Sequence, residues 1–159
     1  MLRFITLLVA FVFSITITAQ EKTEKEDIKN VIETFFDGLH KGDSSIVKKT
    51  IHKDIKIQTT ATNREGKKTL RTETRTKLLQ AIASKKPDAV YLEKLLSYDI
   101  KIDGNLASVW TPYEFYFNGK FSHCGANSFQ LFNNNGKWEI IFLVDMRRRQ
   151  SCKALNEKK

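Results

Sequence analysis

The sequence predicts an α+β fold, with N-terminal helices packed against the concave face of a curved antiparallel sheet. Helical periodicity of apolar residues is strongest in the first half of the chain, and long β-like segments separated by hairpin signals fill the second half from residue 90 onward. The composition, with 41% hydrophobic and 28% charged residues in a chain of 159, is typical of one globular domain.

The first helix is predicted between Thr23 and Gly42, because six apolar residues recur there at spacings of three and four. These residues are Ile28, Val31, Ile32, Phe35, Phe36 and Leu39. Gly42 can end this helix in a left-handed conformation, and Asp43 can then cap a short second helix that contains Ile46 and Val47.

A strand with alternating apolar residues is predicted over residues 54–60, followed by a turn at residues 63–66 and a short return segment. A third helix follows, with Thr74 as its cap and an end before Pro87. Four long antiparallel strands are then predicted over residues 90–102, 106–117, 120–132 and 137–147. Strands of this length indicate a strongly curved sheet.

Residues 1–19 have the pattern of a secretory signal peptide: Arg3 supplies the charge, residues 4–18 the apolar segment and Ala19 a small residue before the cut. The apolar segment contains four hydroxyl residues and falls short of a membrane span, so no stable membrane anchor is expected after cleavage. We therefore expect residues 20–149 to form the domain, residues 150–159 a polar tail, and the protein to be secreted or periplasmic.

The net charge of +9 is spread along the chain except at Arg147–Arg149, which together with export argues against nucleic acid as a partner. Cys124 and Cys152 can form a bridge only if their Cα atoms lie within about 7 Å, and we expect both to be free. The sequence contains no zinc-ligand spacing, and we expect no metal or other cofactor.

Three segments carry a family resemblance: Trp110-Thr-Pro-Tyr-Glu-Phe-Tyr, Asn118-Gly-Lys-Phe-Ser-His-Cys-Gly and Gly136-Lys-Trp-Glu-Ile-Ile-Phe-Leu-Val-Asp. With the order of elements above, they resemble the nuclear transport factor 2-like superfamily, and within it the small exported SnoaL-like or "putative lumazine-binding" proteins of bacteria. The resemblance implies a cone-shaped fold whose mouth opens a pocket. It does not choose a reaction, because the superfamily includes isomerases, hydrolases, dehydratases and plain binding or dimerisation modules.

A two-residue hairpin turn at Asn118-Gly119 would place Phe117 opposite Lys120 and Glu114 opposite His123. The same sheet face would then carry Trp110, Tyr116, Phe121, Gly125, Asn127 and Phe129. Aromatic rings around Glu, His and Asn are typical of a pocket that stacks a flat ligand and binds its edges. A carboxylate beside a histidine can also form a general base, or be only a cross-strand pair.

Asp145 and Arg147 lie two residues apart near the end of the last strand and must share a face. Whether that face is the face of His123 depends on the register set by the loop at residues 133–136. The pair can line the rim of a pocket or form a surface ion pair. His40 and His52 have no partner motif and are expected to be solvated.

Three functions are consistent with this sequence. The leading hypothesis is an exported protein that binds a small aromatic or apolar molecule between the first helix and the sheet, through Trp110, Tyr116, Asn127 and Arg147. The second is a cofactor-free lyase, isomerase or hydrolase that uses His123 with Glu114 or Asp145. The third is a homodimer formed through an exposed sheet face that includes Tyr113 and Phe115.

Overall fold

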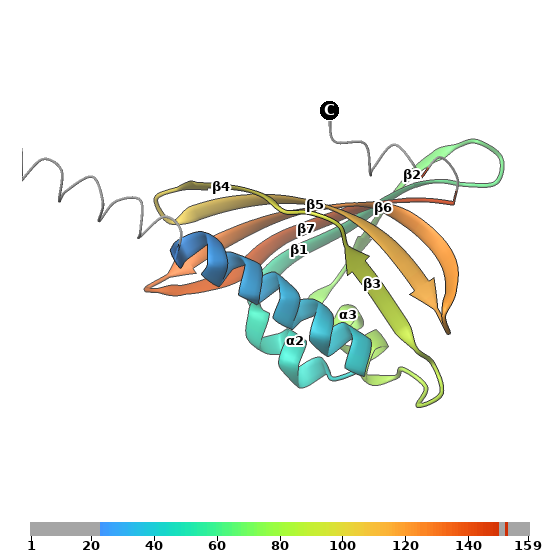
Figure 1. The fold of residues 1–159 in the computed structure, drawn as a ribbon, viewed down its shortest axis with the longest axis horizontal. Coiled ribbons are helices and arrows are strands. Elements are labelled where there is room, and N and C mark those ends of the chain that lie inside the picture. The colour runs from blue at the N-terminus through green and yellow to red at the C-terminus, as the bar shows by residue number, and fades with distance from the viewer. Residues whose placement is uncertain (1–22, 150–151, 153–159) are drawn as a thin grey trace, which may run out of the picture.

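The computed structural model describes residues 23–149 and Cys152. The predicted signal peptide, and the predicted tail apart from Cys152, lie outside these residues. Helices cover one face of a single curved sheet, so the α+β prediction is confirmed (Figure 1).

Residues 23–41 form the first helix, and its apolar stripe places Ile28, Ile32, Phe35 and Phe36 in the core. Gly42 takes the predicted left-handed conformation, with φ of 74°. Asp43 then caps α2 (Ser44–Thr50) by accepting hydrogen bonds from the backbone amides of Ser45 and Ile46. Both helices lie under the concave face of the sheet (Figure 1).

The next elements are β1 (Ile51–Thr62), β2 (Lys68–Glu73) and α3 (Arg75–Ala83), which Thr74 caps as predicted. The predicted strand 90–102 is two strands, β3 (Tyr91–Leu95) and β4 (Asp99–Asp103), which both pair with β5. The remaining strands are β5 (Leu106–Phe117), β6 (Lys120–Asn134) and β7 (Lys137–Arg148).

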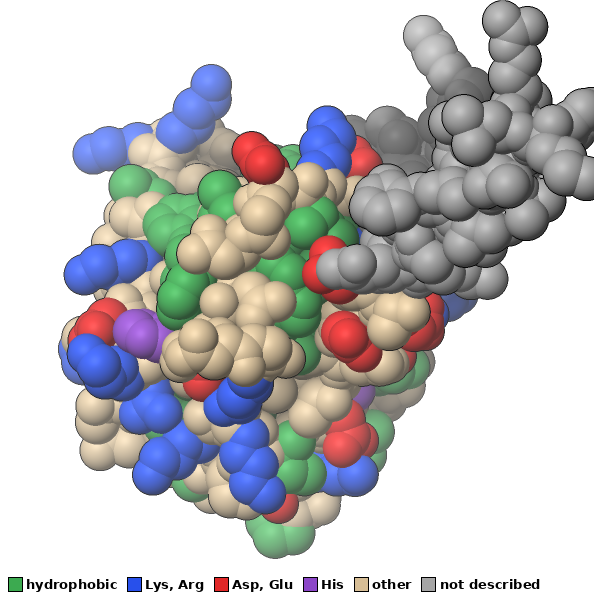
Figure 2. Space-filling view, turned by 90° about the vertical axis from the view of Figure 1, so that its left-hand side faces the viewer, with side chains coloured by type: hydrophobic (Ala, Val, Ile, Leu, Met, Phe, Trp, Pro, Cys, Tyr) green, Lys and Arg blue, Asp and Glu red, His purple; other side chains and the backbone are tan. Residues whose placement is uncertain are grey.

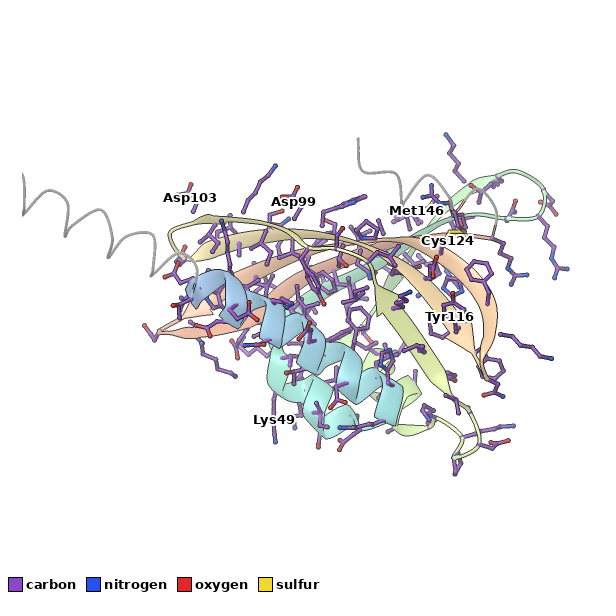
Figure 3. The ribbon with its side chains drawn as sticks, in the orientation of Figure 1. Lys49, Asp99, Asp103, Tyr116, Cys124 and Met146 are labelled. Carbon is purple, nitrogen blue, oxygen red and sulfur yellow. A yellow bond between two sulfur atoms is a disulfide. The ribbon has the colours of Figure 1, made fainter. Side chains whose placement is uncertain are left out.

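The sheet has the order β2-β1-β7-β6-β5-β3, with β4 beside β5. All pairs are antiparallel except β1 and β7, which run parallel and bring Ala61 opposite Arg147. The core lies between the concave face and the helices and includes Phe129, Leu131 and Trp138. Side chains such as Asp99 and Asp103 of β4 lie on the other, convex side (Figure 3).

The predicted register of the β5–β6 hairpin is correct only next to its turn. Phe117 pairs with Lys120 and Tyr116 with Phe121, but Phe115 pairs with His123 and Glu114 with Cys124. A β-bulge at Ser122 therefore adds one residue to β6 and exchanges the faces of all later β6 residues relative to β5. The prediction that Glu114 faces His123 is wrong.

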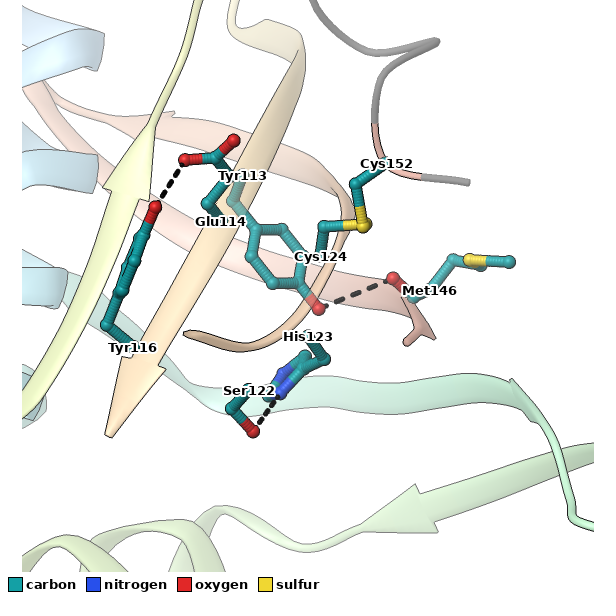
Figure 4. Close-up of a disulfide and its surroundings, with 8 residues drawn as sticks. All are labelled: Tyr113, Glu114, Tyr116, Ser122, His123, Cys124, Met146 and Cys152. Atoms are coloured by element: carbon teal, nitrogen blue, oxygen red, sulfur yellow. Dashed lines mark hydrogen bonds between the residues drawn. A yellow bond between two sulfur atoms is a disulfide. The ribbon is translucent and has the colours of Figure 1, made fainter. Parts of the chain in front are cut away.

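The prediction that both cysteines are free is also wrong. Cys124 and Cys152 form a disulfide, with their Cα atoms 6.0 Å apart (Figure 4). The bond joins the chain that follows β7 to β6, close to the pair that Cys124 makes with Arg148. Among the residues described, none is a free cysteine.

Candidate functional site

The bulge defines which predicted site residues lie together. On the concave face, Tyr113 and Phe115 of β5 stand beside His123, Gly125 and Asn127 of β6. In the same way β7 contributes Asp145, opposite Asn127, and Arg147, opposite Gly125. Four of the seven predicted site residues therefore share one face: His123, Asn127, Asp145 and Arg147.

The other three lie on the convex face. Trp110 is 51% exposed, and Tyr116 donates a hydrogen bond of 2.9 Å to Glu114 Oε2. Figure 4 shows this bond turned away from His123, which lies near the ring of Tyr113. Glu114 therefore does not act on His123, and Trp110 and Tyr116 do not line a concave pocket.

The same register corrects the predicted dimer surface. Tyr113 is only 1% exposed, and Phe115 stacks on His123 with ring centroids 4.8 Å apart. Both face inward, because they lie on the side of β5 that carries Val109 and the core. The exposed convex face carries Trp110 and Leu106 instead.

A cavity of about 830 Å³ opens where the β1–β2 hairpin meets the end of β7. Its lining consists of Ala61, Thr62, Asn63, Arg64, Arg71, Ser122, His123, Arg147, Arg148 and Arg149. The parallel pairing of β1 with β7 makes this cavity, because it brings the hairpin next to the arginines at the end of β7.

A buried polar cluster lies behind Arg147. Asp145, 8% exposed, accepts hydrogen bonds from Thr59 Oγ1 at 2.6 Å and from Arg147 Nε. Asn127, 3% exposed, donates a bond of 2.8 Å to Glu93 Oε1. Burial raises the pKa of Glu93 to about 7, because desolvation and the nearby Asp145 charge outweigh the bond from Asn127 and the Arg147 charge.

Tyr113 and His123 complete the inner face. Tyr113 donates a hydrogen bond of 3.3 Å to the carbonyl of Met146, and burial together with Glu93 and Asp145 raises its pKa, so the phenol stays protonated. Burial also lowers the pKa of His123, and Arg147 lowers it further while Asp145 opposes the shift. His123 is therefore neutral at neutral pH, which is the state a general base requires.

A smaller cleft of about 310 Å³ lies where the sequence hypothesis placed the pocket, between the first helix and the sheet. Its lining consists of Glu33, Phe36, Asp37, His40, Glu93, Leu95 and Tyr98, so it contains none of the predicted site residues. His40 is half-buried rather than solvated, because its Nε2 accepts a hydrogen bond of 2.8 Å from the backbone amide of Glu93. Burial lowers the pKa of His40, although Asp37 raises it.

The sequence hypothesis missed four functional candidates: Glu93, Tyr113 as an inner residue, Arg64 and Arg71. Alternation along the strand offered one signal that Glu93 faces inward. Tyr91, Glu93 and Leu95 share a face of this short strand, and Tyr91 and Leu95 are typical of an inward face. No local signal joins Arg64 and Arg71 to Arg147, because only the β1–β7 pairing brings them together.

His123 and Arg147 thus connect the arginine-lined cavity with an inner face that also carries two carboxyl groups and a phenol. These groups can bind a polar ligand or exchange a proton with it. Among the residues described, no group of three or more His, Cys, Asp or Glu side chains is placed to hold a metal ion. Likewise, none of the helices searched in the described part is long and apolar enough to cross a membrane.

The model of the family described as "putative lumazine-binding" matches residues 23–143. This chain belongs to that family. None of the curated proteins matches the sequence.

Solved structures that resemble this member of the putative lumazine-binding family include nuclear transport factor 2-like proteins. One from Novosphingobium aromaticivorans is 13% identical with a TM-score of 0.66, and the match covers 91% of this chain and 96% of that one. One of unknown function from Shewanella baltica is 18% identical with a TM-score of 0.58, over 80% and 96% of the two chains. A putative dehydratase from Streptomyces avermitilis is 10% identical with a TM-score of 0.59, over 80% and 98%. These likenesses establish the nuclear transport factor 2-like fold.

Proposed function

We propose that this protein is an exported small-molecule-binding protein whose ligand occupies the 830 Å³ cavity beside His123 and Arg147. The observation that carries the proposal is this cavity, which has the size of a small-molecule site and opens beside buried polar side chains that can fix a ligand. The family description supports binding of a small heterocycle, and the disulfide supports residence in an oxidising compartment.

The lining changes the expected character of the ligand. Most of the lining residues are polar or cationic, so a purely apolar molecule would leave their polar groups desolvated. A flat polar ligand fits better, because His123 already stacks on Phe115 and can supply both a ring face and a hydrogen bond.

The test begins with mass spectrometry of small molecules that co-purify with the native protein, with lumazine as the first defined probe. Each hit is titrated against the wild type, His123→Ala and His52→Ala, a matched control because His52 lies on β1 and does not line the cavity. We expect His123→Ala to weaken binding by roughly 5- to 150-fold, the cost of one buried polar partner. Equal binding by all three proteins would place the ligand elsewhere.

A second candidate function is a cofactor-free lyase, isomerase or hydrolase, and the observation that favours it is Glu93. A carboxyl group with a pKa of about 7 beside Asn127 suits acid–base catalysis at neutral pH better than an exposed one. If a hit is converted, we expect the rate to change with pH near 7 and to fall in Glu93→Gln. Turnover that Glu93→Gln leaves unchanged would remove this role.

The homodimer stays a prediction, but the surface that would form it is now the convex face of the sheet. Trp110 and Leu106 are exposed there, but charged Asp99, Lys101 and Asp103 of β4 lie opposite or between them. Light scattering after size exclusion measures the state directly, and Trp110→Lys should convert a dimer formed through this face to a monomer.

A further inference from the structure

The cavity at the β1–β2 hairpin has a strongly one-signed lining. Five of its ten lining residues are arginines, from the hairpin turn, from β2 and from the end of β7, and none is Asp or Glu. Lys and Arg side chains also cover the opposite end of the molecule, but there Asp, Glu and hydrophobic side chains lie among them (Figure 2). The cavity therefore concentrates positive charge in a hollow rather than on an open surface.

Most of these arginines have no counter-charge within the described part of the protein. Arg147 is paired with Asp145, but the side chains of Arg64, Arg71, Arg148 and Arg149 make no hydrogen bond or ion pair with the described residues. The Nε atom of Arg148 is also buried without a hydrogen-bond partner there. Positive charges that line one cavity repel one another, and an anion bound between them relieves that repulsion.

His123 responds to this charge. Burial lowers its pKa first, and Arg147 and Arg149 lower it further. Its Nδ1 lies 3.1 Å from Ser122 Oγ, so the imidazole is held at the wall of the cavity as a neutral hydrogen-bonding group. The cationic character of the cavity thus comes from guanidinium groups, which remain charged at all physiological pH values.

We propose that this cavity binds a small anion with more than one negative charge, whose phosphate or carboxylate groups pair with Arg71, Arg147 and Arg149. The planar fork of arginine donates two parallel hydrogen bonds to either group, which suits both chemistries. A small ligand fits better than a nucleic acid, because these arginines line a hollow at one end of the sheet and do not form an extended stripe. The inference rests on the proposed function, since it names the ligand class of the same cavity.

The test is calorimetric titration of the full mature protein at low salt with pyrophosphate and with citrate, which separate phosphate from carboxylate. Arg71→Gln and Arg149→Gln each remove one exposed cavity charge, and Lys68→Gln is the matched control, with the same loss of charge on the same strand as Arg71 but outside the cavity. We expect at least one anion to bind to the wild type. Its affinity should be about tenfold or more weaker in either arginine variant, and within about twofold of the wild type in the control. Added sodium chloride should weaken the binding further.

Two outcomes would overturn the inference. The first is that Lys68→Gln weakens the binding of the anions as much as Arg71→Gln does. The anions would then be attracted only by the net charge of the protein and not by the cavity. The second is that neutral lumazine binds and depends on His123 while neither anion binds, which removes the anion and leaves the proposed function standing. Failure of the proposed function has a different signature, because then neither lumazine, nor an anion, nor any co-purifying molecule depends on the cavity residues.

Discussion

Glu93 combines three features: partial burial, a hydrogen bond from Asn127 and a second carboxylate, Asp145, nearby. Folding removes water from Glu93 and so favours its protonated form. The result is a group that changes charge near neutral pH, in the lining of the cleft under the first helix.

The raised pKa of Glu93 makes folding stability depend on pH. Between about 4.5 and about 7 the folded protein binds more protons than the unfolded chain, so the free energy of unfolding falls as the pH rises through this window. Glu93→Gln stays neutral and can still accept the bond from Asn127. We expect the variant to be more stable than the wild type by about 2–3 kcal/mol at pH 8, and by under about 1 kcal/mol at pH 5.

Urea unfolding of both proteins at the two pH values measures this difference. Burial lowers the pKa of His40 and Asp37 raises it, but the charge of Glu93 does not contribute to this shift, so we expect its effect to cancel in the comparison. A stability difference that stays the same at pH 5 and pH 8 would contradict the assignment.

Gly125 is important because it has no side chain. A Cβ atom at this position would lie 1.7 Å from the carbonyl oxygen of Met146 and 3.0 Å from the ring of Tyr113. Gly125→Ala must therefore push β7 or Tyr113 out of place, and we expect a loss of about 3 kcal/mol or more in chemical unfolding. Ser128→Ala on the same strand is the control. A Gly125→Ala variant as stable as that control would show that β6 and β7 are less closely packed at Gly125 than the structure shows.

The disulfide fixes the chain beyond β7 to β6. It closes a loop between residues 28 apart in the sequence, and Arg148 and Arg149 lie within that loop. Constraining a loop of this length in the unfolded chain stabilises the fold by about 3–4 kcal/mol on the chain-entropy account. The bond also limits how far these two arginines can move from the cavity.

Cys152→Ser should therefore lower the free energy of unfolding by about 3 kcal/mol, and treatment of the wild type with a reductant should give the same loss. If the cavity binds pyrophosphate, its affinity should fall in the same variant. Unchanged stability in both the variant and the reduced wild type would mean that the bond is not formed in solution.

Among the elements, the features that a local sequence signal marks could be predicted, and a bulge without such a signal could not. Thr74, Asp43 and the Asn118-Gly119 turn each act within a few residues, and all three do what the sequence predicts. The bulge at Ser122 has no glycine or proline to mark it, yet it exchanges two sheet faces. Asn127 shares the face of His123 as predicted, because both follow the bulge on β6. The bulge moves Glu114, Trp110 and Tyr116 of β5 to the other face.

Across the whole molecule, the arginine cavity brings together residues that lie far apart in the sequence. Arg64 and Arg71 belong to the β1–β2 hairpin, whereas Arg147 and Arg148 end β7 and Arg149 follows it directly. Only the parallel β1–β7 pair brings these residues together. In the sequence the same residues are a dispersed basic charge with one short run. The functional meaning of the charge therefore comes from topology and not from composition.

Export also concerns the whole molecule, because it determines whether residues 1–19 are removed and in which compartment the cysteines are oxidised. Arg3 and the apolar segment up to residue 18 favour cleavage after Ala19, and the disulfide at Cys124 fits an oxidising compartment. Intact mass spectrometry of the protein from the extracytoplasmic fraction should give the mass of residues 20–159, lower by two hydrogen atoms for the bridge. The Cys152→Ser variant controls for the bridge, since its mature form should lack that deficit. An uncleaved chain that begins at Met1 in the soluble cytoplasmic fraction, with both thiols reduced, would contradict both the export and the compartment that the disulfide requires.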